Sequence, residues 1–115
     1  MPFNRGQVAL ALFPDSNLRT AKKRPVLVVQ ADNLGTGLPQ NIVAMITSNL
    51  ARAGHPSRVS VSLATVPGQQ SGLKTDSLIM TDNLATVFDT EIDRVIGVWT
   101  DMPTVGRALR HTLGL

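Results

Sequence analysis

Short apolar runs separated by turn-forming residues make up most of this chain. The runs are four to six residues long and rich in valine and isoleucine, which is typical of β-strands rather than helices. The predicted strands span residues 8–13, 26–29, 42–47, 59–63, 78–81 and 95–99. Clusters of proline, glycine, asparagine and aspartate predict a turn at 14–17 and a loop at 32–39. The chain is therefore predicted to be mainly β.

The pattern within each run predicts how deeply it is buried. Val26–Val29 is apolar throughout, as expected of a strand covered on both faces. Val59–Leu63 alternates apolar residues with serine, so one of its faces should be exposed. The glycine, proline and glutamine of Pro67–Gly72 predict a long mobile loop. Trp99 and the three phenylalanines are expected to fill the core.

The end of the chain is predicted to be helical. Pro103 suits a first helical turn, Asp101 supplies negative charge there, and Gly114 suits a C-cap. Apolar residues recur at helical spacing and form one face: Met102, Val105, Ala108, Leu109 and Leu113. Several short strands followed by one amphipathic helix predict a small β-barrel with the helix packed across it.

Length and composition limit the class of protein further. A chain of 115 residues fits one domain, spanning 1–115. The absence of cysteine excludes disulfides, thiolate catalysis and cysteine-ligated metals, and two histidines without metal-ligand spacing argue against zinc. No apolar run approaches the roughly 20 residues that span a bilayer, and residues 1–5 lead into no signal-peptide core. We expect a cytoplasmic protein with no membrane association, no metal and no other cofactor.

Positive charge is concentrated near the start of the chain. Residues 1–24 hold five of the 11 basic residues but one of the eight acidic residues. The segment Arg19–Arg24 is predicted to be a flexible basic loop, and Pro25 favours an extended conformation at Arg24. The Arg24 guanidinium would then lie where a mobile loop meets a buried strand, a suitable place to bind a phosphate. The charge indicates an anionic partner such as nucleic acid, although a solvated basic loop that aids solubility is the alternative.

Six short motifs spread along the chain resemble, in their order and spacing, those of the MazF/PemK toxins, which are endoribonucleases of type II toxin–antitoxin pairs. Each motif is weak alone, but the ordered set covers essentially the whole chain. The resemblance implies an SH3-like barrel of the MazF/PemK/CcdB type with a C-terminal helix, and a homodimer. It also implies metal-independent cleavage of single-stranded RNA and inhibition by a cognate antitoxin. The motifs are Arg5–Val8, Lys23–Val28, Ile46–Ser48, Gly72–Ser77, Thr81–Asn83 and Ala108–Leu115.

Two residues match the catalytic pair of that family, Arg24 before the strand proline and Thr47 at the end of the following strand. Metal-free cleavage can use the ribose 2′-OH as nucleophile, giving a 2′,3′-cyclic phosphate and a 5′-OH end. Arg24 could bind two phosphate oxygens at once, and the Thr47 hydroxyl could donate to the same phosphate. Without the resemblance, ordinary strand propensity would explain Thr47.

The general base is not defined by the sequence. Many relatives carry a glutamate in the loop before the arginine, but residues 16–23 contain no carboxylate here. Asp82, in an Asp-Asn pair that matches the family's Asp-Gln motif, is the candidate, and a turn cap is the alternative. Met80 stands where some relatives have an arginine. Four further residues are expected to hold the RNA: Arg19, Lys22, Lys23 and Ser48.

Two other functions remain open. A gyrase-poisoning toxin similar to CcdB would share the fold, but that class acts through a C-terminal Trp-Gly-Ile, and this chain ends Leu113-Gly114-Leu115. The missing loop glutamate also leaves a catalytically silent RNA-binding barrel as a possibility.

Overall fold

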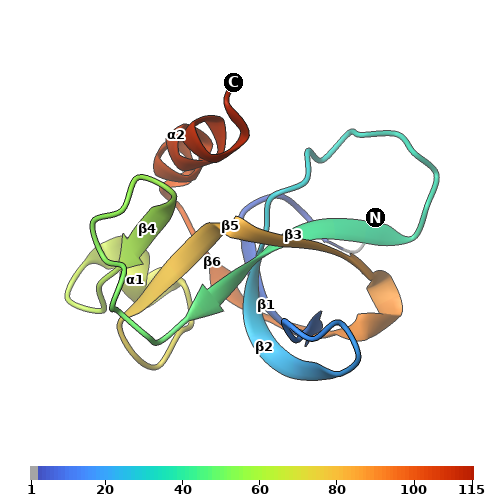
Figure 1. Cartoon of the computed structure of the whole chain (residues 1–115), viewed down its shortest axis with the longest axis horizontal. Helices are drawn as coiled ribbons and strands as arrows, with labels where there is room; N and C mark the ends of the chain where they lie inside the picture. Colours follow the sequence, from blue (N-terminus) through green and yellow to red (C-terminus); the bar gives the residue numbers. More distant parts are fainter. Residues whose placement is uncertain (1–2) are drawn as a thin grey trace.

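Six antiparallel strands form one sheet in the order β4-β5-β3-β2-β1-β6 (Figure 1). The structure is a computed structural model and describes residues 3–115. Its elements are β1 (Gln7–Pro14), β2 (Ala21–Val28), β3 (Gln40–Thr47), β4 (Arg58–Val61), α1 (Val66–Gln70), β5 (Ser77–Phe88), a 3₁₀ turn η1 (Asp89–Glu91), β6 (Ile92–Val98) and α2 (Met102–Leu113). The predicted barrel-like β fold with a C-terminal helix is confirmed.

The sheet is curled, and register shifts in its strand pairing contribute to the curl. β3 pairs with β5 from Gln40 to Thr47, and the register shifts between Ala44 and Met45. β1 pairs with β2 on one side and with β6 on the other, again with register shifts toward β6. Such irregularities increase the local twist of a strand, which helps the sheet to close on itself.

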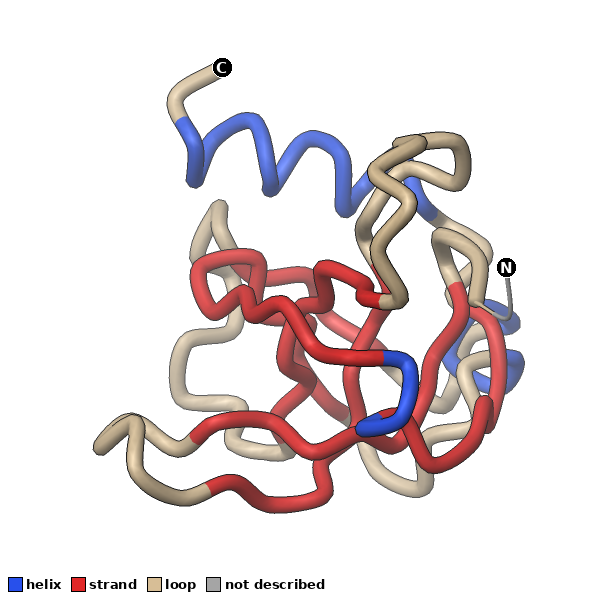
Figure 2. Tube along the Cα trace, turned by 90° about the vertical axis from the view of Figure 1, so that its right-hand side faces the viewer, coloured by secondary structure: helices blue, strands red, loops and turns tan. Residues whose placement is uncertain are grey.

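Two apolar cores lie on opposite faces of the sheet. Val8, Leu27 and Ile79 belong to the core that α2 covers through Val105 and Ala108. Figure 2 shows α2 lying alongside the curled sheet rather than inside it. The second core lies within the curl and contains Ala9, Ala11, Phe13, Val26, Val28, Val43, Val87 and Ile92. Among the described residues, no helix is long and apolar enough to cross a membrane.

Several detailed predictions are confirmed. Val26, Leu27, Val28 and Val29 are all buried, as the continuous apolar run predicted. β4 alternates buried valines with more exposed residues. The C-terminal helix begins with Pro103 in its first turn and ends at Gly114, whose φ of 72° is that of a left-handed C-cap.

Other predictions are wrong. The basic segment is a loop only up to Thr20, because Ala21–Arg24 belongs to β2 and pairs with β1. The stretch predicted as a mobile loop contains α1, whose N-cap Thr65 accepts a hydrogen bond from the Gly68 amide at 3.2 Å. β5 continues far beyond the predicted end at residue 81, and the Phe88 side chain is 57% exposed rather than in the core.

Candidate active site

A hollow of about 510 Å³ opens where β2 and β3 approach the loop that follows α1. Arg24 reaches it from β2, and Thr47 and Ser48 reach it from the end of β3. The pairing of β2 with β3 covers Val26 to Val28, so Arg24 lies just beyond the paired segment. The fold therefore brings the two predicted catalytic residues to one cavity from different strands.

The hollow is strongly basic. Its lining contains no aspartate or glutamate. Four cationic side chains line it: Lys23, Arg24, Lys74 and Arg94. Lys23 also pairs with Asp93 at 3.3 Å, but both side chains are about half exposed, so that pair is weak. Charges of one sign that line a concave surface attract and concentrate anions there.

A close approach of the segment after α1 to β6 places Lys74 and Thr75 at the hollow. Gly72 has φ +75°, and a Cβ atom there would lie 2.0 Å from the Ile96 carbonyl oxygen. On the other side, a Cβ atom at Gly97 would lie 2.3 Å from the Ser71 carbonyl oxygen. Only glycine fits at both positions, so the segment after α1 packs directly on the backbone of β6.

Arg24 is held by a carboxylate from the turn between β1 and β2. Its Nη2 atom donates to Asp15 Oδ1 at 2.6 Å, and Thr20 Oγ1 donates to Asp15 Oδ2 at 2.6 Å. The pKa of the Asp15 carboxyl lies below its usual value, first because of the hydrogen bond from Thr20 and then because of the one from Arg24. Arg24 Nε is buried and has no hydrogen-bond partner among the described residues.

Thr47 is the last residue of β3, and the chain turns away immediately after it. Its hydroxyl oxygen accepts a hydrogen bond from the Asn49 amide at 3.1 Å, which orients the side chain. The hydroxyl hydrogen stays available to a ligand in the hollow. Ser48, which follows, is exposed and also lines the hollow.

Not every residue predicted to hold RNA lies at this hollow. Lys22 lines a neighbouring hollow of about 690 Å³, formed by the β1–β2 turn, which shares Arg24 and Met45 with the first. Lys22 can therefore act on the same ligand from the other side of Arg24. Arg19 lies exposed in the turn and lines neither of these hollows.

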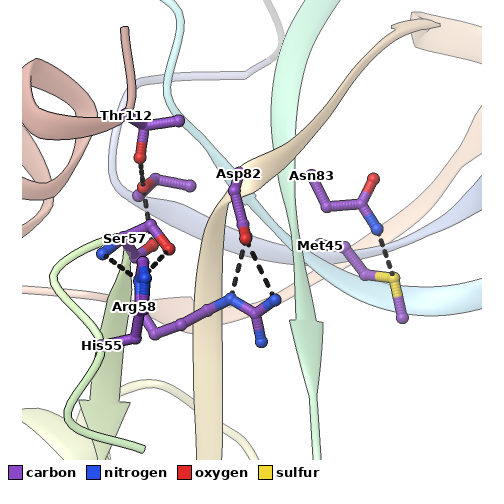
Figure 3. Close-up of polar contacts among 8 residues, drawn as sticks. Met45, His55, Ser57, Arg58, Asp82, Asn83 and Thr112 are labelled. Atoms are coloured by element: carbon purple, nitrogen blue, oxygen red, sulfur yellow. Dashed lines mark hydrogen bonds and ion pairs between the residues drawn. The ribbon is translucent and has the colours of Figure 1, made fainter. Parts of the chain in front are cut away.

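Asp82, the third predicted catalytic residue, is not brought to the hollow that Arg24 and Thr47 share. It forms a two-point ion pair with Arg58, from Nε to Oδ1 at 2.8 Å and from Nη2 to Oδ2 at 3.1 Å (Figure 3). Burial acts to raise the pKa of Asp82, but the hydrogen bonds and charge of Arg58 outweigh burial, and the pKa lies below its usual value. In this conformation Asp82 is a poor proton acceptor and a partner for Arg58.

Sequence reasoning missed four residues that the fold adds to this region. Lys74 and Thr75 belong to a motif that supported the family resemblance, so they could have been proposed. Arg94 comes from β6 and carries no such signal. Asp15 immediately precedes residues 16–23, which contain no carboxylate, and only the hydrogen-bonded turn reveals its contact with Arg24.

The fold and the hollow together define a small β-barrel protein with a basic hollow at the ends of β2 and β3. Residues 4–113 match the family described as PemK-like, MazF-like toxin of type II toxin-antitoxin system. The chain therefore belongs to the MazF/PemK family of toxins.

Relatives similar to this chain over its full length are endoribonucleases. The chain is 36% identical, over 119 residues and the whole of both proteins, to endoribonuclease MazF2 of Mycobacterium bovis and to endoribonuclease MazF6 of Mycobacterium tuberculosis. Its fold is similar to that of the Mycobacterium tuberculosis toxin MazF-mt6, with a TM-score of 0.72 and 22% identity over 95% of this chain and 97% of that one. It is also similar to a mycobacterial endoribonuclease solved in complex with its cognate antitoxin, with a TM-score of 0.74 and 22% identity over 98% of this chain and 96% of that one.

Proposed function

We propose that this chain is the toxin of a type II toxin–antitoxin pair and cleaves single-stranded RNA without a metal ion. The observation that carries the proposal is the basic hollow shared by Arg24 of β2 and Thr47 of β3. Family membership and the endoribonuclease relatives support the same activity. The reaction would take place in the cytoplasm, where messenger RNA is available.

In the proposed reaction the ribose 2′ oxygen attacks the adjacent phosphorus. The new bond forms as the bond to the 5′ oxygen breaks, and the proton lost by the 2′-OH is balanced by one gained at the 5′ oxygen. The products are a 2′,3′-cyclic phosphate and a 5′-OH end. DNA lacks the 2′-OH, so the chemistry itself selects RNA.

Arg24 and Thr47 act on the phosphate in this mechanism. Negative charge grows on the non-bridging oxygens, and Arg24 is permanently protonated, so it stabilises that charge rather than accepting a proton. The Thr47 hydroxyl donates to the same phosphate. Ser48, Lys22 and Lys23 hold the flanking RNA, and Arg19 contributes at longer range.

Incubation of the purified protein with a long single-stranded RNA in EDTA tests this function. The parent protein should cut the RNA, and the new 5′ ends should accept phosphate from a polynucleotide kinase without phosphatase treatment. Arg24→Ala and Thr47→Val should each lose most of the cleavage, whereas Arg107→Ala, which removes an exposed arginine of α2, should cut at the parent rate. Products with 5′-phosphate ends would refute 2′-OH attack, and RNA binding without cleavage would indicate a silent RNA-binding protein.

We also propose that two copies form a two-fold dimer and that a cognate antitoxin binds the basic hollow. One similar structure contains an endoribonuclease in complex with its cognate antitoxin, which supports the existence of such a partner. Some apolar side chains at the C-terminus are exposed, among them Leu113 and Leu115. They offer apolar surface for contact with a second copy or with the antitoxin.

A further inference from the structure

The turn between β1 and β2 is held by its own hydrogen bonds rather than by packing. The Asp15 amide donates to the Thr20 carbonyl at 2.8 Å, and the Leu18 amide donates to the Asp15 carbonyl at 2.9 Å. Asn17 Oδ1 accepts from the amides of Arg19 and Thr20 at 2.8 and 3.2 Å. Asp15 therefore has a defined backbone position although most of the turn is exposed.

The side chain of Asp15 links this turn to Arg24. One carboxylate oxygen is fixed by Thr20 Oγ1, and the other accepts from Arg24 Nη2, both at 2.6 Å. The Asp15 side chain is 15% exposed and that of Arg24 is 29% exposed, so this pair is better shielded from water than the pair that the neighbouring Lys23 forms with Asp93. A charge-assisted hydrogen bond of this length and shielding fixes geometry more firmly than a surface pair.

We propose that Asp15 is the positioning residue of Arg24, holding its guanidinium where it meets the RNA phosphate; this inference rests on the proposed function. Arginine has several rotatable bonds, and a loosely held guanidinium would seldom present two N–H groups to one phosphate. Asp15 engages one nitrogen, and the buried Nε is directed away from solvent. The other terminal nitrogen, Nη1, has no hydrogen bond to another described residue and remains open to a ligand.

Two other roles fit the geometry less well. A general base must accept a proton, but hydrogen bonds from Thr20 and Arg24 keep the pKa of Asp15 below that of a free aspartate. An inhibitory contact would occupy the whole guanidinium fork, but Asp15 binds Arg24 through a single nitrogen. The carboxylate therefore aligns the arginine and leaves a donor free.

Steady-state cleavage of RNA in EDTA by Asp15→Asn tests the proposal. Asparagine keeps the shape and removes the charge that orients Arg24, so kcat should fall by about ten- to a hundredfold, as for a misplaced catalytic group. KM should stay the same or decrease, because a negative charge near the RNA is removed. Asp32→Asn is the matched control, since Asp32 caps the Arg5 amide at 2.6 Å in another part of the molecule. Its kcat and KM should equal the parent's.

A double variant shows whether Asp15 acts through Arg24. In an Arg24→Ala background, Asp15→Asn should cause no further loss of kcat, because the two residues act as one unit. Thr20→Val, which leaves Asp15 in place but removes its second anchor, should lower kcat by less than Asp15→Asn. A parent-like or higher kcat for Asp15→Asn would overturn the proposal. If thermal melting shows that Asp15→Asn does not fold, an unchanged kcat for Thr20→Val would overturn it. Failure of the parent protein to cut RNA would instead refute the proposed function.

Discussion

Arg24 is the residue whose surroundings say most about the chemistry. It extends from a strand whose next residues, Val26 and Leu27, are fully buried, so its backbone is rigid. Asp15 binds one terminal nitrogen and leaves the other free. Lysine would keep the positive charge in this place, but its compact ammonium lacks the planar fork through which arginine can bind Asp15 with one nitrogen and present another to the phosphate.

Arg24→Lys separates charge from geometry. We expect kcat to fall by about 10²–10³, as when one preorganised donor is removed, while RNA binding weakens much less. Single-turnover cleavage in EDTA and a filter-binding titration with uncleavable RNA measure the two quantities. Parent-like cleavage by the lysine variant would mean that charge alone is sufficient.

Asp82 is expected to stabilise the fold rather than to catalyse. Its folded pKa is lowered, so the stabilisation from its pairing with Arg58 is present above the unfolded pKa of about 4 and is lost as pH falls through the folded pKa. Asp82→Asn should therefore reduce the melting temperature at neutral pH and flatten its decline below about pH 4. RNA cleavage in EDTA should be largely retained. A loss of cleavage with an unchanged melting profile would restore Asp82 as a catalytic candidate.

At the scale of elements, the loop after α1 is positioned by its contact with β6. The backbone of Gly72 lies against Ile96, and the buried Ser71 hydroxyl donates to the Gly68 carbonyl at 2.6 Å, which ties α1 to this loop. Lys74 and Thr75 then extend from a fixed base into the hollow. The short helix therefore helps to position one wall of the basic hollow.

Gly72→Ala tests whether this packing contact positions the loop. Alanine would have to adopt φ +75° and place its Cβ 2.0 Å from the Ile96 carbonyl oxygen, so the loop must move. Backbone strain alone should cost about 1–3 kcal/mol of unfolding free energy, and the steric clash with Ile96 should add to that loss. Urea denaturation measures the loss, and RNA binding should weaken as well. Gly54→Ala, which has a similar positive φ of 90° but no atom within 4 Å of the added Cβ, is the control for backbone strain alone. Equal effects of the two substitutions would contradict a packing role for Gly72.

The sequence predicts secondary structure well where the local residue pattern determines it, and poorly where pairing with another strand determines it. Val26–Val29 and the C-terminal helix were predicted correctly, because burial and capping leave clear signals. Ala21–Arg24 looked like a loop since it is basic, but pairing with β1 imposes a strand that composition does not reveal. For the same reason the sequence indicated Arg24 and Thr47 through the family motifs but could not indicate Asp15, whose contact depends on the shape of a turn.

At the scale of the whole molecule, the basic residues near the start of the chain lie close in space to basic residues that are distant in the sequence. Lys74 and Arg94 lie far from Arg24 in the chain, but they line the same hollow. The electrostatic site is thus larger than the N-terminal segment that first indicated an anionic partner. RNA binding should be correspondingly sensitive to salt, because each contacted phosphate releases counterions.

Lys74→Gln tests this enlarged site. The slope of log affinity against log salt should decrease in magnitude by about 1, the change expected when one phosphate contact is lost. The rate of cleavage at saturating RNA should change little, because Lys74 is expected to attract RNA and not to act on the reacting phosphate. Fluorescence anisotropy with uncleavable RNA over a range of salt concentrations measures the slope. An unchanged slope would remove Lys74 from the binding surface.

The same concentration of charge leads to a prediction about the antitoxin. An acidic segment of the antitoxin would place carboxylates where RNA places phosphates, and Arg24 binds both groups through the same donors. It already binds one carboxylate, that of Asp15, at 2.6 Å. We therefore expect antitoxin and RNA to exclude each other. The apparent Kd for antitoxin binding should rise linearly with the concentration of added uncleavable RNA. Arg24→Ala should weaken the binding of both RNA and antitoxin, whereas Arg107→Ala should leave both affinities unchanged. Simultaneous binding of RNA and antitoxin to the same copy, with neither affinity reduced, would place the antitoxin on another surface.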